Sequence, residues 1–192
     1  MKDLTDELTQ EHETIKVVLK TLTKMVDQSK ITKDYNVNDV EDIVDFLTEF
    51  IHKNHFKKEE LLFDFLSSVA TKTEIEEFNN LSLDHRNERR IVKEIVMTLD
   101  KCNSISPCSC QMIIDEVKMY IDQISSHIEK EDTQIFPLIV SISNGQEQLE
   151  ISNQIEKIQN QIFIKKNVLY YQLLAKRLEE KYLLSKQFAF YW

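Results

Sequence analysis

The chain contains almost no glycine or proline. Among its 192 residues only Gly145 is a glycine, and only Pro107 and Pro137 are prolines. Tight turns and hairpins depend on these residue types, whereas long helices are broken by them. Their scarcity predicts an all-α fold. A length of 192 residues with 42% hydrophobic residues suits one domain with its own core and a shorter appendage.

Long apolar runs and an excess of basic charge are also missing. No run approaches the roughly 20 apolar residues of a membrane span, and the charged start MKDLTDELTQEHE lacks the apolar segment of a signal peptide. The net charge of −9 disfavours nucleic acid, because its phosphates are bound by clustered Lys and Arg. We expect a cytoplasmic protein with no membrane span and no nucleic-acid partner.

Cysteine is scarce and confined to one short segment. Cys102, Cys108 and Cys110 lie in CNSISPCSC, an odd number in a chain without a secretion signal, so a disulfide framework is not expected. No fourth cysteine or nearby histidine completes a zinc set. Reduced thiols in a loop are the favoured interpretation, with a thiol sensor or a second metal site as alternatives.

Four of the five histidines divide between two similar halves of the chain. Each half has one isolated histidine, followed 43 or 42 residues later by an H-x-x-x-E pair. Residues four apart on a helix are neighbours on one face, so such a His and Glu can bind one metal, or the Glu can bridge two. The candidates are His12, His55 and Glu59 in the first half, and His85, His127 and Glu131 in the second.

Apolar residues at three- and four-residue steps predict four helices around these candidates, within residues 8–26, 44–66, 78–99 and 113–138. Polar clusters predict turns near residues 33, 72 and 106. His12 lies about 21 residues before the first turn and His55 about 22 after it, so both reach one level at roughly 1.5 Å per residue. The same count holds for His85 and His127. The spacing predicts an up-down-up-down four-helix bundle over residues 1–144, with all candidates in one layer.

The residue types point to a dinuclear metal site. Two metals roughly 3.5 to 4 Å apart repel unless anionic ligands lie between them, and two glutamates meet that need. A buried glutamate is also unfavourable unless it is paired or metal-bound, which favours a metal over histidines that are merely hydrogen-bonded in the core. Imidazole and carboxylate ligands suit iron, and also manganese or zinc. Iron is the favoured interpretation.

These motifs resemble the hemerythrin-like, or HHE cation-binding, family. The similar segments are LTQEHETI, HFKKEELLF, LSLDHRNERR and HIEKEDTQIFP, and the resemblance covers about residues 5–140. It implies the up-down-up-down bundle for which myohemerythrin is an established example. It also implies a non-haem di-iron site in which His12, His55, His85 and His127 are terminal ligands and Glu59 and Glu131 are bridges.

The chain departs from the oxygen-carrying members of this family at one position. Those members have a further histidine one turn after the helix-three ligand, and Arg89 stands there instead. The four-histidine site looks symmetric, as in relatives linked to iron sensing, nitric oxide response or peroxide chemistry. Glu88 is a candidate for a further ligand, and Asp132 an alternative to Glu131, which fits the apolar stripe better. His52 is expected to be a surface or supporting residue.

The segment 145–192 is predicted to be a C-terminal helical extension. Apolar residues recur along it at helical spacing, from Ile151 through Ile155, Ile158 and Ile162 to Tyr182. From residue 160 onward, six Lys or Arg and two Glu give +4, which leaves −13 for the rest. Three interpretations compete: a helix packed on the bundle, a dimerisation helix, or a docking helix for a protein partner or an acidic surface.

Two classes of function fit this sequence. The first is a binding protein or sensor for a small ligand such as oxygen, nitric oxide or iron itself. The second is a di-iron enzyme acting on nitric oxide or peroxide, or an iron donor in a stress response. A structural zinc bundle without redox chemistry is a third interpretation.

Overall fold

The computed structural model describes residues 5–32, 36–102, 110–143, 145–159 and 166–185. These ranges are almost entirely helical, and no strand occurs within them. The predicted all-α class is therefore confirmed.

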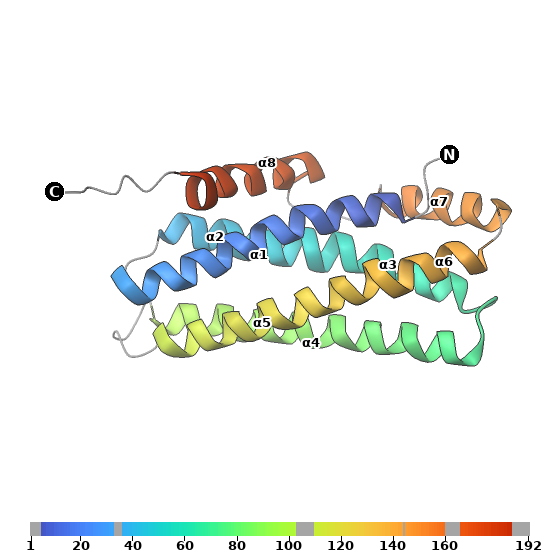
Figure 1. Ribbon diagram of the computed structural model, residues 1–192, viewed down its shortest axis with the longest axis horizontal. Helices are drawn as coiled ribbons and strands as arrows, with labels where there is room; N and C mark the ends of the chain where they lie inside the picture. The colour runs from blue at the N-terminus through green and yellow to red at the C-terminus, as the bar shows by residue number, and fades with distance from the viewer. Residues whose placement is uncertain (1–4, 33–35, 103–109, 144, 160–165, 186–192) are drawn as a thin grey trace.

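Four helical rods lie side by side along the long axis of the molecule (Figure 1). The second and fourth rods each contain a π-helical segment. α4 packs along α5, and α1 packs against α5. In chain order the rods are α1 (Asp6–Thr32); α2 (Val37–Asp45), η1 (Phe46–His55) and α3 (Phe56–Leu66); α4 (Lys72–Cys102); and α5 (Cys110–Lys130), η3 (Glu131–Ile135) and α6 (Phe136–Ile142).

Side-chain caps fix where two of these rods begin. The Asn36 side chain accepts a hydrogen bond from the backbone N–H of Asp39 at 3.1 Å, which satisfies a donor at the start of α2. Before α4, the backbone N–H of Thr71 donates to Glu74 Oε2 at 2.6 Å, and the backbone N–H of Glu74 donates back to Thr71 Oγ1 at 3.4 Å. This reciprocal pair is a capping box.

The π-helical segments adjoin candidate metal ligands. η1 ends at His55, and η3 begins at Glu131. Such widened turns are rare and occur often at functional sites, because they rotate the side chains that follow. A search for a 3.6-residue period does not reveal them.

The core consists of two apolar clusters, one on each side of a polar layer. Every rod contributes to both clusters: α1, for example, gives Leu8 to one and Ile15 to the other, and His12 lies between them. The same order holds along α4, where Leu81 and Ile91 belong to different clusters. The candidate ligands therefore interrupt the core at one level.

The C-terminal extension forms two helices in the described residues, where the sequence predicted one. α7 (Gly145–Gln159) packs against α3, and α8 (Val168–Glu179) with π-helical η4 (Glu180–Leu184) packs against α1. Ile151 is buried in one apolar cluster, and Tyr171 and Leu178 are buried in the other. Of the three interpretations of this segment, packing on the bundle is the one seen here. The side chains of Ile155, Ile158 and Ile162 lie outside the described residues.

The basic character of this segment matches an acidic surface on α2. Arg177 donates to Asp39 Oδ1 at 2.9 Å and to Asp42 Oδ2 at 2.7 Å. Lys181 Nζ and the Tyr182 hydroxyl each donate to Asp39 Oδ2 at 2.5 Å. Burial opposes ionisation of Asp39, but these hydrogen bonds outweigh it and lower its pKa. Asp39 is thus the centre of the contact that α2 makes with α8 and η4.

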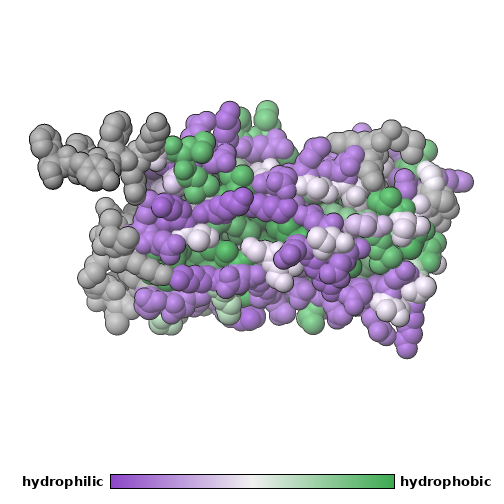
Figure 2. All heavy atoms as spheres, in the orientation of Figure 1, coloured by the Kyte–Doolittle hydropathy of each residue, from purple (hydrophilic) through white to green (hydrophobic). Residues whose placement is uncertain are grey.

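The viewed surface of α1 is mostly hydrophilic (Figure 2). No helix in the described ranges is long and apolar enough to cross a membrane.

The prediction for the three cysteines concerns side chains outside the described residues.

Replacing Asp39 tests the contact between α2 and α8. Asp39→Asn should destabilise the protein by about 1–2 kcal/mol, because several charge-assisted hydrogen bonds to one buried carboxylate are weakened together. Urea denaturation measures this loss. Asp42→Asn is the matched control and should cost less than about 1 kcal/mol, since its ion pair with Arg177 is largely exposed. Equal effects of the two substitutions would contradict the central role of Asp39.

Candidate metal centre

The fold brings the six candidate residues into one buried layer. None is more than 4% exposed, and each rod provides at least one of them. They are His12 from α1, His55 from η1, Glu59 from α3, His85 from α4, His127 from α5 and Glu131 from η3.

The layer contains two overlapping groups that can each hold a metal ion. Within each group, the potential ligand atoms lie within 4.8 Å of one another. Glu59 and Glu131 belong to both groups. His12 and His55 complete the first group, and His85 and His127 complete the second.

Glu59 presents one oxygen to each pair of histidines. Its Oε1 lies 3.1 Å from His55 Nε2 and 3.5 Å from His12 Nε2, whereas its Oε2 lies 3.3 Å from His85 Nε2. Glu131 is arranged in the same way, with Oε2 3.4 Å from His12 Nε2 and Oε1 3.2 Å from His127 Nε2. Each carboxylate therefore spans the two groups, as a bridging ligand must.

The polar atoms that face this layer are poorly satisfied by the protein itself. Both oxygens of Glu59 and of Glu131, and Nε2 of His12 and His55, are buried without a hydrogen-bond partner among the described residues. Nε2 of His85 and Nε2 of His127 lie 3.0 Å apart. Unsatisfied polar groups are unfavourable in an apolar core. A cation in each group would satisfy all these atoms, so the residues present fit a dinuclear metal centre.

A carboxylate lies behind each histidine of the first group. Nδ1 of His12 is 2.7 Å from Asp132 Oδ1, and Nδ1 of His55 is 2.9 Å from Glu11 Oε2. A carboxylate at this nitrogen accepts its hydrogen and leaves the Nε2 lone pair directed at the metal position, the usual arrangement for metal-binding histidines.

The second group has the same arrangement with longer distances. Nδ1 of His85 is 3.4 Å from Glu60 Oε1, and Nδ1 of His127 is 3.8 Å from Asp84 Oδ2. Neither Nδ1 has a hydrogen-bond partner among the described residues. These two imidazoles are therefore held less tightly than those of the first group.

Three of the four carboxylates are themselves paired with a cation. The ion pairs are Lys16 with Asp132 at 2.8 Å, Lys58 with Glu11 at 2.7 Å, and Arg89 with Glu60 at 2.8 Å. Lys58 is completely buried. A row of cation, carboxylate and imidazole thus supports His12, His55 and His85.

The chain matches the model of one protein family, described as the hemerythrin HHE cation-binding domain, over residues 3–139. The chain belongs to the hemerythrin HHE family. No curated protein and no solved structure matches it. The resemblance inferred from the histidine motifs is confirmed, and the match ends shortly before α7.

Arg89, which stands where oxygen-carrying hemerythrins have a further histidine, supports the second group from outside. It pairs with Glu60, and its guanidinium carbon lies 5.3 Å from the centre of the Phe56 ring. Phe56 in turn stacks on His85 at 4.0 Å between ring centres. On the other side of the layer, Phe136 of the F-P motif stacks on His12 at 5.3 Å. Aromatic rings therefore shield both groups.

The three other residues considered from the sequence lie outside the two groups. Asp132 accepts from His12 Nδ1, so Glu131 rather than Asp132 faces the centre. His52 stacks on Phe56 at 5.4 Å, and burial, together with the charge of Arg89, lowers its pKa to about 3. Glu88 is fully buried, and burial raises its pKa to about 7.

Sequence reasoning missed Glu11, Lys58, Glu60 and Asp84. Their signal was weak because charged residues next to a motif are normally solvated. One sign was available in HFKKEELLF: Lys58 lies three residues after His55, on a face that also carries the apolar stripe.

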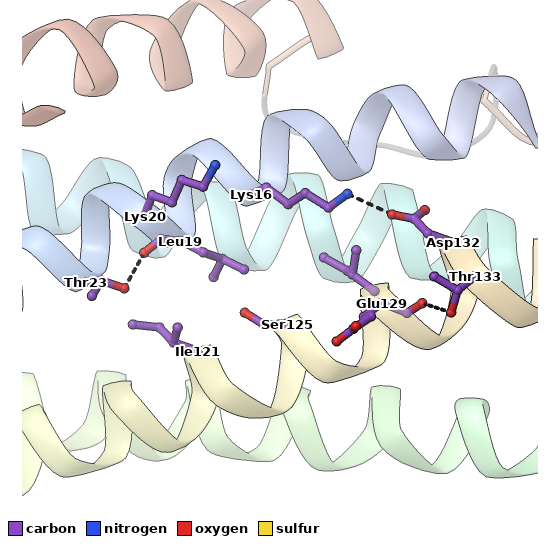
Figure 3. Close-up of a pocket in the computed structure, with 10 residues that line it drawn as sticks. Lys16, Leu19, Lys20, Thr23, Ile121, Ser125, Glu129, Asp132 and Thr133 are labelled. Atoms are coloured by element: carbon purple, nitrogen blue, oxygen red, sulfur yellow. Dashed lines mark hydrogen bonds and ion pairs between the residues drawn. The ribbon is translucent and has the colours of Figure 1, made fainter. Parts of the chain in front are cut away.

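A groove of about 380 Å³ lies between α1 and α5 and ends near the first group. Figure 3 shows Lys16 reaching from α1 to Asp132 across this groove. The groove reaches the supporting ion pair but is lined by none of the six candidate residues. It therefore exposes a support of His12 to solvent, and the buried layer stays closed to it.

The metal-free layer favours protonated histidines. Burial alone lowers the pKa of His12, but the hydrogen bond to Asp132 and the nearby carboxylates of Glu131 and Glu59 outweigh it and raise this pKa well above its usual value. Burial likewise lowers the pKa of His127, and the charge of Glu131 reverses this effect. Metal binding must displace these protons, so it should release protons to solvent.

The stability of the metal-free protein should fall as pH rises from about 6 to about 9. A raised histidine pKa contributes stability that is complete below about pH 6.5 and is lost as pH rises through the folded-state value. The raised pKa of Glu88 acts in the same direction between its usual value and about 7. We expect a loss of about 1 kcal/mol or more, measured by urea denaturation with a chelator present.

His12→Gln is the control for this pH dependence and should reduce the slope. Metal-free stability that is constant or increases from pH 6 to pH 9 would show that these imidazoles do not hold protons in the folded protein.

Proposed function

We propose that this protein binds two iron ions in one carboxylate-bridged centre and uses it to bind or sense a small ligand. The ligands are His12, His55, His85 and His127 as terminal groups, and Glu59 and Glu131 as bridges. The observation that carries the proposal is that each glutamate directs one oxygen to each pair of histidines, without any other hydrogen-bond partner.

We also propose that the four rods follow the up-down-up-down order, and that residues 1–144 form the metal-binding unit with residues 145–192 as its extension. The family match over residues 3–139 supports this division. The extension still shares the core, because α8 packs against α1 and η1.

The donor set supports iron. Each group combines two imidazoles with carboxylates and contains no thiolate, which resembles the two-histidine, one-carboxylate set of non-haem iron sites that keep open positions. Bound iron would supply redox chemistry and positions for an added ligand. Manganese or zinc would satisfy the same donors.

The surroundings of the centre restrict what can reach it. Phe56 and Phe136 cover imidazoles on opposite sides, and the six candidate residues are almost completely buried. Such a site suits oxygen, nitric oxide or peroxide rather than a larger substrate. The carboxylates behind His12 and His55 hold these two imidazoles in one tautomer, and the burial of the layer excludes bulk water.

A second candidate function is a di-iron enzyme that acts on nitric oxide or peroxide, or a donor of iron in a stress response. The observation that favours it is the unequal support of the two histidine pairs, since a loosely held pair can change ligands more readily. The same centre would serve both candidate functions. They differ in whether the protein only binds its ligand or also converts or releases what it has bound.

Metal stoichiometry tests the proposed centre. After anaerobic loading with ferrous iron, the protein should retain two irons per chain by elemental analysis. Glu59→Ala and His127→Ala should each lose most of this binding, because each removes a bridge or a terminal ligand. His52→Gln is the matched control, since it replaces a histidine outside both groups and should leave two irons in place. Retention of less than one iron by the unaltered protein would rule out the proposal.

Optical spectra separate the candidate functions. The iron-loaded protein should form a stable coloured adduct with oxygen, peroxide or nitric oxide if it is a binding protein or sensor. Repeated consumption of peroxide or nitric oxide with return of the starting spectrum would instead identify an enzyme. Iron-loaded protein that shows no change with any of the three ligands would contradict binding and turnover of these ligands, and would leave iron donation as the function of the centre.

A further inference from the structure

The two metal positions differ in one buried residue that lies beside them. Ile15 follows His12 by three residues on α1, and Glu88 follows His85 by three residues on α4. Both side chains are 0% exposed. Residues three apart lie on neighbouring parts of one helix face, so each side chain stands next to the histidine of its own rod. The first position therefore has an apolar neighbour where the second has a carboxylate.

The carboxylate of Glu88 has no partner within the described part of the chain. Both of its oxygens are buried without a hydrogen bond. The charged groups that influence it are two imidazoles, His127 and His85, and two carboxylates, Glu131 and Asp84. No lysine or arginine is among them. An unpaired buried carboxylate is strongly unfavourable and is normally retained only where a cation or a hydrogen-bond donor completes it.

The histidines of the second position have weaker support from neighbouring carboxylates than those of the first. His12 and His55 are held by carboxylates at 2.7 and 2.9 Å, whereas the corresponding distances for His85 and His127 are 3.4 and 3.8 Å. Weaker support makes these two imidazoles poorer donors. A further anionic group on this side would compensate.

We propose that Glu88 is a third carboxylate for the metal held by His85 and His127 and has no role at the metal held by His12 and His55. It acts by binding the metal after a rotation of its side chain or through one bound water, since it lies outside the four-residue groups of the present structure. The centre then has two unequal positions. This inference rests on the proposed dinuclear centre, whose six ligands form two equivalent groups, and Glu88 would make the two positions differ.

Anaerobic titration with ferrous iron, followed by calorimetry, tests this inference without any activity assay. The unaltered protein should bind two irons in two steps. Glu88→Gln keeps the shape of the side chain and removes its charge, so it should weaken one step about 10- to 100-fold and leave the other within about threefold. Glu88→Asp keeps the charge and should recover part of the loss. Glu116→Gln, which alters a glutamate three turns before His127, should change neither step.

The affected step is assigned with variants that disable one position. In a His12→Ala background, Glu88→Gln should still weaken the remaining iron. In a His85→Ala background it should have no effect. Thermal unfolding of metal-free Glu88→Gln should show no loss of stability at pH 8, because the substitution removes an unpaired buried charge. A merely structural role would instead lower the unfolding temperature.

The outcomes distinguish a failure of the proposed role of Glu88 from a failure of the proposed dinuclear centre. Two irons bound equally well by the unaltered protein and by Glu88→Gln would overturn the role of Glu88 and leave the centre intact. Less than one iron bound by the unaltered protein would overturn the centre itself.

Discussion

The structure depends on two buried carboxylates surrounded by four imidazoles. Glu59 and Glu131 are 0% exposed and lie midway between two apolar clusters, where an unpaired charge is least tolerable. Only a compact set of positive or metal-bound partners makes this arrangement favourable. All four rods must therefore deliver their polar residue to one level, and this requirement constrains rod length, turn position and the phase of each helix at once.

Charges of alternating sign surround this layer, with carboxylates behind the imidazoles and cations beside most of these carboxylates. Each imidazole has a carboxylate behind it, and Lys16, Lys58 and Arg89 neutralise three of those carboxylates. Of these three pairs, only Lys58–Glu11 is fully buried, and truncating one of its members would leave the other charge unpaired, which usually costs more than the pair contributes. The rows thus fix the orientation of the histidines before any metal binds.

The sequence predicts the inner layer better than the outer one, for a physical reason. His12 and Glu59 interrupt apolar stripes, so their burial is visible from periodicity. Glu11 and Lys58 look like ordinary solvated residues, and only the crossing of α1 with η1 and α3 shows that they neutralise each other. The two-helix extension was missed because periodicity does not register a break without glycine or proline.

Within the extension, α8 contacts the helices of one histidine pair, whereas α7 packs against α3, which carries Glu59. α8 packs against α1 and η1, which carry His12 and His55, and its Tyr171 shares a core cluster with Ile15. Buried contacts of this kind restrict the motion of the helices they join. His12 and His55 are therefore restrained in two ways: each has a carboxylate within 2.9 Å of its Nδ1, and α8 packs against the helices that carry them. His85 and His127 of the second group come from α4 and α5, and their Nδ1 atoms lie farther from a carboxylate, at 3.4 and 3.8 Å. The protein therefore holds His12 and His55 more firmly than His85 and His127, so the side chains of the second group have the greater freedom to move.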